Sequence, residues 1–119
     1  MGYRIHRVLP GEATDIGWTF VAHDLRGHIK AGETIASVVS VKAYDSDGNE
    51  VTGVFADTPA PSVDSDGLTV LARCSPSVAT FTEDVTLAVE VTALSSAGET
   101  VIWTDMREER PRLWINARP

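Results

Sequence analysis

Two long stretches of the chain alternate between two sets of residues with a period of two, and this pattern constrains the fold most. In residues 83–95, EDVTLAVEVTALS, the apolar set is Val85, Leu87, Val89, Val91 and Ala93. In residues 33–44, ETIASVVSVKAY, the corresponding set is Ile35, Ser37, Val39, Val41 and Ala43. Because successive side chains of a strand point to opposite faces, each stretch predicts a β-strand with one face to bury.

Shorter runs rich in β-branched and aromatic residues predict further strands. These are residues 17–22, 50–55, 67–74, 79–81, 99–106 and 112–116. The residues between the strands are those of turns, and DTPAPSVDSDG at 57–67 predicts an exposed loop that crosses between sheets. Helix signals are weak, since the one candidate, DLRGHIKAG at 24–32, contains Gly27.

These elements predict an all-β protein, an antiparallel immunoglobulin-like β-sandwich of seven to eight strands. At 119 residues the chain has room for one core. We assign residues 1–15 to an N-terminal arm and residues 16–119 to a single sandwich domain that ends in an Arg-rich strand. Cys74 is the only cysteine, which excludes an internal disulfide, and we interpret it as a small buried hydrophobe.

The acidic turn after residue 44 has a plainer copy later in the chain. VKAYDSDGNEV from Val41 and VTALSSAGETV from Val91 match at five positions, including Gly48 and Gly98. The acids of the first turn suggest a calcium loop, but Glu50 stands where such a loop needs Gly. The copy keeps its Gly and has no acid at 95–97, so we interpret both segments as hairpin turns and predict no metal site.

Charge is distributed unevenly along the chain. The net charge is −7, from 17 acids and 10 bases, which argues against nucleic-acid binding. Between residues 33 and 106 there are twelve acids and two bases, whereas arginines gather at both ends. This distribution is typical of a module that binds a partner through its termini, with a solvated tail as the alternative.

The arginine-rich ends supply the candidate interface residues. Aromatic residues and Arg are common anchors of protein contacts, and Trp114 lies among arginines in RPRLWINARP. This tail is expected to add as a strand to a sheet, its own or a partner's. Trp18 and Trp103 are instead expected in the core. The candidate interface is Arg4, Arg7, Arg107, Arg110, Arg112 and Trp114.

Motifs of enzymes and membrane proteins are lacking in the sequence. It has no Gly-rich phosphate loop, no Gly-x-Ser-x-Gly and no His-Glu-x-x-His, so we predict no catalytic residues and no cofactor. No apolar run reaches the ~20 residues that span a bilayer. The first residues also lack the apolar stretch of a signal peptide, so we expect the protein to be made and kept in the cytoplasm or assembled there.

Residues 15–41, DIGWTFVAHDLRGHIKAGETIASVVSV, resemble small immunoglobulin-like virion proteins of tailed bacteriophages. That family tends to have a Trp-containing strand, a leucine-bearing segment and then Gly-Asp-Thr-Ile with Ala or Val and Ser. The matching positions are Trp18, Leu25, Gly32, Glu33, Thr34, Ile35, Ala36 and Ser37. Thr92, Gly98 and RPRLWINAR fit the family's second half, whereas Glu33 replaces the usual Asp and the N-terminal arm has no family pattern.

The resemblance implies a non-enzymatic structural protein of a virion that assembles in the host cytoplasm. The expected role is capsid decoration, in which an oligomer, by resemblance a trimer, binds the head surface and its major capsid protein through the terminal segments. A tail or fibre adaptor is the alternative. A more distant one is a free carbohydrate- or protein-binding module, which would need an exposed aromatic platform such as Trp18 or Trp103.

Overall fold

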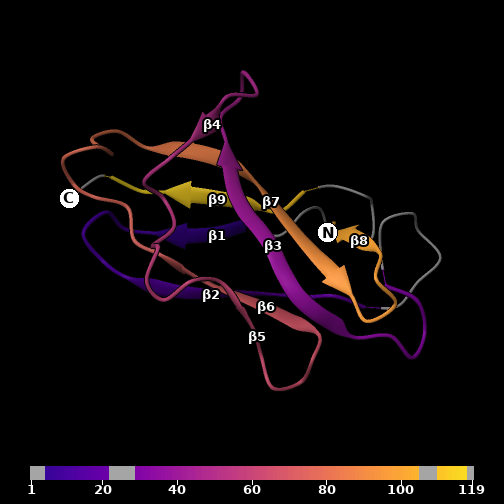
Figure 1. The fold of residues 1–119 in the computed structure, drawn as a ribbon. Coiled ribbons are helices and arrows are strands. Elements are labelled where there is room, and N and C mark those ends of the chain that lie inside the picture. Colours follow the sequence, from indigo (N-terminus) through magenta and orange to yellow (C-terminus); the bar gives the residue numbers. More distant parts are fainter. Residues whose placement is uncertain (1–4, 22–28, 105–109, 118–119) are drawn as a thin grey trace.

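The computed structural model describes residues 5–21, 29–104 and 110–117. These residues form nine β-strands in two sheets and include no helix (Figure 1). It follows that this part of the chain has no helix long and apolar enough to cross a membrane. The prediction of an all-β protein built from two sheets is confirmed.

The larger sheet has the strand order β1-β9-β7-β3-β4, with β8 also paired to β7. Because β3 occupies one edge of β7, strands β9 and β8 share the other edge, β9 along the first half of β7 and β8 along the second. Among the strands that the structure describes, only β1 and β9 pair in parallel. The bounds are β1 (Ile5–Val8), β3 (Ile35–Tyr44), β4 (Glu50–Val51), β7 (Val85–Ser95), β8 (Thr100–Ile102) and β9 (Arg112–Ile115).

The smaller sheet has the order β2-β6-β5. Its strands are β2 (Thr14–Thr19), β5 (Ser62–Val63) and β6 (Thr69–Cys74). The segment after β4 does cross from the larger to the smaller sheet, as residues 57–67 predicted. It also contains β5, which pattern reading missed because two residues cannot show an alternation.

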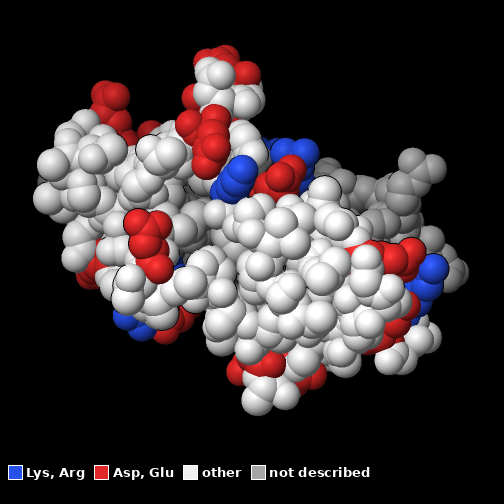
Figure 2. Space-filling model, viewed as in Figure 1, with Lys and Arg blue, Asp and Glu red and all other residues white. Residues whose placement is uncertain are grey.

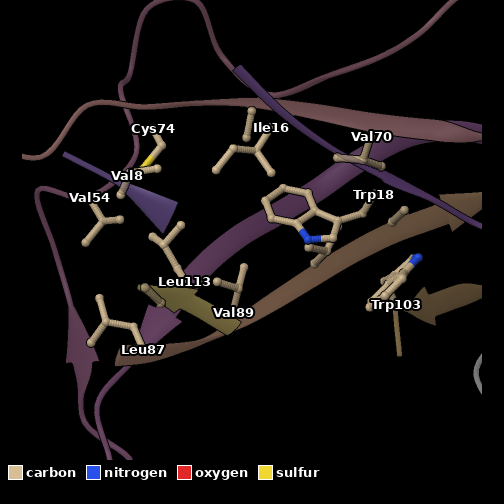
Figure 3. Packing of buried hydrophobic residues seen from close by; sticks show 14 of the residues in the cluster. Val8, Ile16, Trp18, Val54, Val70, Cys74, Leu87, Val89, Trp103 and Leu113 are labelled. Carbon is tan, nitrogen blue, oxygen red and sulfur yellow. The ribbon is translucent and has the colours of Figure 1, made fainter. Parts of the chain in front are cut away.

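The core lies between the two sheets and is built from both (Figure 3). Trp18 from β2 is fully buried at its centre and Trp103 is 8% exposed, which confirms both as core residues. Burial of Cys74 raises the pKa of its thiol to about 12, because a low-dielectric interior disfavours the thiolate. The prediction that Cys74 is a small buried hydrophobe is therefore confirmed.

The two long strands differ in how well they follow the predicted alternation. In β7, the predicted inward residues Leu87, Val89 and Val91 are buried. In β3, Val39 was predicted to face inward but is 58% exposed. The pairing with β7 shifts register between Ile35 and Ser37 and again between Val38 and Ser40. Each shift is a bulge that adds one residue to β3 and reverses its phase.

Two other predicted strands are corrected. The strand predicted at 79–81 is not formed: residues 78–80 form a turn, in which the N–H groups of Thr80 and Phe81 donate to the carbonyl of Ser77. The strand predicted at 50–55 is reduced to β4, followed by a single bridge between Phe55 and Cys74. At the N-terminus, residues 5–8 of the segment assigned to an arm form β1 in the larger sheet, and β2 begins inside that segment.

The two matched hairpins, β3–β4 and β7–β8, are related to each other within the sheet. Their equivalent residues Val41 and Val91 are direct register partners. The same equivalence of the hairpins relates Lys42 to Thr92 and Ser40 to Glu90. It therefore turns the register pair Lys42–Glu90 into the register pair Thr92–Ser40. A local two-fold axis therefore passes between Val41 and Val91, and β4 and β8 pair at opposite ends of the central pair.

The turn between β5 and β6 is held by the carboxylate of Asp66. Its Oδ1 accepts the N–H groups of Leu68 at 2.8 Å and Thr69 at 2.9 Å, and its Oδ2 accepts the Thr69 hydroxyl at 2.7 Å. These bonds, with that of Leu68 first, favour the ionised form and lower the pKa of Asp66 from its ordinary 3.8. The contribution to stability is therefore present above the unfolded pKa and lost as pH falls through the folded value.

We expect Asp66→Asn to lower the free energy of unfolding at neutral pH, by an amount that shrinks as pH falls below the ordinary value of 3.8. The measurement is the urea unfolding midpoint of wild type and variant across this pH range. Asp57→Asn, at another exposed aspartate, is the control, and its difference in unfolding midpoint from the wild type should not shrink in this way. A difference for Asp66→Asn that stays constant into acid would contradict the prediction.

Candidate functional site

The structure brings together candidate interface residues from the two ends of the chain. Strands β1 and β9 pair in parallel, with Ile5 opposite Arg112 and Arg7 opposite Trp114. Arg4 and Arg107 of the predicted set lie outside the described residues. The tail does add as a strand to its own sheet, where β9 inserts between β1 and β7.

Alternation sends the side chains of these two strands to opposite faces of the sheet. Val8, Leu113 and Ile115 are buried in the core, so Arg7, Arg112 and Trp114 lie on the outward face. The guanidinium carbon of Arg7 lies 5.5 Å from the centroid of the Trp114 ring, a cation–π contact. This contact holds an exposed cation against a half-buried aromatic ring on the outward face.

The same outward face continues across the centre of the larger sheet. Arg110 Nη2 lies 3.4 Å from Glu90 Oε2 on β7, and Lys42 on β3 is the register partner of Glu90. Lys42 is one of the two bases between residues 33 and 106, and its phase, opposite to buried Ala43, places it on the outward face. Four of the six described Lys and Arg residues thus share this surface, which we call the cationic face: Arg7, Lys42, Arg110 and Arg112.

The β3–β4 hairpin forms the acidic boundary of this face. It projects beyond the rest of the sheet (Figure 1). Figure 2 shows acidic atoms at its tip and basic atoms beside its base. We call residues 45–50 the acidic hairpin, in which Asp47 and Glu50 are exposed and Asp45 is half-buried.

The acids of this hairpin shape its turn. Oδ1 of Asp45 accepts the N–H groups of Asp47 at 2.9 Å and Asn49 at 3.0 Å. In the second hairpin, Oγ of Ser95 accepts those of Ala97 at 3.3 Å and Glu99 at 3.2 Å. Both turns also place Gly in a left-handed conformation, with φ of 85° at Gly48 and 84° at Gly98. The interpretation as matched hairpin turns is confirmed, and in each turn the first side chain accepts two backbone N–H groups.

The His, Cys, Asp and Glu side chains of the described residues are dispersed. Within residues 5–21, 29–104 and 110–117, no three His, Cys, Asp or Glu side chains are grouped to hold a metal ion. A hollow of about 430 Å³ lies between β3 and the crossing segment, and its charged lining residues are Lys42, Glu50 and Asp57. The described residues that line it include neither His nor Cys, so the hollow lacks a nucleophile–base pair built on either residue.

No protein-family model and no curated protein matches the chain. Its function is therefore inferred from its residues and their geometry.

The equivalence of Asp45 and Ser95 gives a stability prediction. Asp45→Ala should lower the free energy of unfolding by about 0.5–1.5 kcal/mol, because two turn N–H groups lose their acceptor. Asp45→Ser should retain most of the stability, since Ser95 already serves this role in the second hairpin. Urea unfolding midpoints measure both effects. Equal losses in the two variants would show that the side-chain oxygen does not hold the turn.

Proposed function

We propose that this chain is a non-enzymatic structural protein that assembles through its cationic face, and that it decorates a bacteriophage capsid. The observation that carries the assembly role is the parallel pairing of β1 and β9, which fixes Arg7, Arg112 and Trp114 on one outward surface. Arginine beside an aromatic ring is the composition that protein interfaces favour. The virion assignment is supported by the resemblance of residues 15–41 to virion proteins of tailed phages.

We further propose that the sandwich is of the immunoglobulin type. The order β9-β7-β3-β4 corresponds to strands G-F-C-C′ of a variable-type domain, and β2-β6-β5 to B-E-D. In this correspondence β8 and β9 together form one interrupted last strand along β7. Buried Trp18 then fills the middle of the sandwich in a chain without the inter-sheet disulfide.

The two alternative functions are a free binding module and a tail or fibre adaptor. A free module with an aromatic platform at Trp18 or Trp103 is disfavoured, because both side chains are in the core. A tail or fibre adaptor would use the same cationic face and differs from a decoration protein only in its place on the particle. Mass spectrometry of separated heads and tails distinguishes these two roles, and the head fraction is the expected one.

Binding to particles tests the assembly surface. The test adds purified protein to phage particles that lack it and measures the amount bound. Arg7→Ala combined with Arg112→Ala should reduce this amount about tenfold, because two exposed cations of the interface are lost. Arg73→Ala is the matched control, since Arg73 pairs with Asp15 on the smaller sheet at 2.9 Å. Full occupancy by the double variant, or absence of the protein from both heads and tails, would overturn the proposal.

A further inference from the structure

The larger sheet carries opposite charges at the two ends of one exposed face. Arg7 and Arg112 lie on the pair β1 and β9 at one end of the strand order. Asp47 and Glu50 lie on the acidic hairpin, which belongs to β4 at the other end. With strands about 4.8 Å apart, four steps separate β1 from β4 by roughly 19 Å, and three steps separate β9 from β4 by roughly 14 Å. Arg7 and Arg112 are therefore too far from the acidic hairpin to form ion pairs with it within one molecule, although Lys42 lies near its base.

We propose that the partner of the cationic face is a second copy of this chain, whose acidic hairpin docks on Arg7 and Arg112 in a two-fold symmetric pair. This inference rests on the proposed assembly role of the cationic face, but not on the identity of the particle. It names the partner that the assembly role leaves open.

The strand order allows both charge contacts to form within one two-fold symmetric dimer. Strand β7 is the third of five in the order β1-β9-β7-β3-β4. A two-fold axis parallel to the strands and above β7 places the β1–β9 end of each copy over the β4 end of the other. Both charge contacts then form at once, in an isologous interface that uses the same patch on each copy.

The residues at the centre of the face can pack against the same residues of a second copy. The outward residues of β7 next to β9 are Thr86 and Ala88, which are small and uncharged. Glu90, which would approach its own copy near the axis, is paired with Arg110 at 3.4 Å and lies opposite Lys42. The repulsion between the two Glu90 side chains is therefore reduced by Arg110, which precedes β9, and by Lys42 on β3.

The shape of the hairpin also fits this arrangement. The acidic hairpin stands out from the sheet, with its acidic atoms at the end of the projection (Figures 1 and 2). A projecting hairpin can reach across to the opposite edge of a facing copy. Its acids thereby meet Arg7, which the cation–π contact with Trp114 already holds in place, so less side-chain freedom is lost on docking.

Complementary charge reversal tests the pair in solution. One variant carries Arg7→Glu and Arg112→Glu, and the other carries Asp47→Lys and Glu50→Lys. Asp45 is left unchanged because it holds the turn. Each variant alone should be a monomer by light scattering at low ionic strength, because like charges meet at both contacts. An equimolar mixture should recover a dimer, with twice the 12.8 kDa of one chain, because both contacts are again between opposite charges.

The wild type should be a dimer whose dissociation constant rises with salt, since the contacts lie at an exposed face. Circular dichroism of each variant establishes that it is folded. A three-fold ring would respond differently, because two complementary variants cannot alternate around an odd number of subunits. A wild-type monomer or trimer, or folded variants that stay monomeric when mixed, would overturn the two-fold pair.

The same measurements separate this inference from the proposed function. A wild-type chain that occupies particles but is a monomer in solution would refute the two-fold pair and leave the structural role standing. A dimer that is found on no particle would support the two-fold pair and refute the proposed structural role.

Discussion

Removal of residues 110–119 should abolish cooperative unfolding of the domain rather than yield a folded protein without a tail. The deleted segment contains β9, which lies between β1 and β7. Leu113 and Ile115 on this strand are fully buried, and loss of one such side chain typically costs about 2–5 kcal/mol. Two such losses, with the pairing of β1 also gone, approach the whole stability of a small domain, about 5–15 kcal/mol.

Urea denaturation followed by circular dichroism measures this effect. The control is Arg110→Ala, which removes an exposed ion pair with Glu90 and should change stability by no more than about 1 kcal/mol. A truncated chain that unfolds with the wild-type slope would contradict the placement of β9 in the sheet. Deletion of this segment is consequently no test of an interface, and single side-chain changes are needed for that purpose.

The second large effect is expected at Trp18. Trp18→Ala should lower the free energy of unfolding by about 3–5 kcal/mol, because the indole is fully buried. Its ring packs edge-on against His6 and Phe55, with centroids 5.9 Å and 6.3 Å apart, so both contacts are lost as well. At about 3–5 °C for each kcal/mol, the melting temperature should fall by about 10–25 °C.

Trp18→Phe separates volume from polarity at the same position. The Nε1 of Trp18 is buried, and the described part of the chain supplies no hydrogen-bond acceptor for it. Phe leaves a smaller cavity and removes this unsatisfied donor, so its cost should be well below that of Ala. Val39→Ala on the exposed part of β3 is the control and should stay within about 0.5 kcal/mol. Similar losses for Trp18→Ala and Val39→Ala would contradict the central place of Trp18.

The sequence predicted those parts of the fold whose signals are local. The regular alternation of β7 and the Gly of each hairpin turn are readable from a few neighbouring residues. The bulges of β3 are not, because Val38 and Val39 are both apolar and either phase satisfies the pattern. Strand β1 has four residues, and its partner β9 is more than a hundred residues away, so only tertiary pairing reveals it.

The candidate site was predicted in composition but not in arrangement. The gathering of arginines at both ends pointed to Arg7, Arg112 and Trp114, and the parallel pairing shows why two distant segments share one surface. Lys42 was missed because it is isolated among acids in the sequence. Its place beside Glu90 depends on the pairing of β3 with β7, a contact between residues nearly fifty positions apart.

The two bulges of β3 bear on the solubility of the protein. The two hairpins differ in what pairs with the first half of their long strand. Strand β9 pairs with the first half of β7, whereas no described strand pairs with the outer edge of the first half of β3. An uncovered edge that is straight and apolar is a template on which further chains can stack. Bulges at two places bend and twist this edge, so a foreign strand cannot form a continuous ladder along it. The irregularity that hides β3 from pattern analysis is therefore also one that disfavours edge-to-edge pairing with another chain.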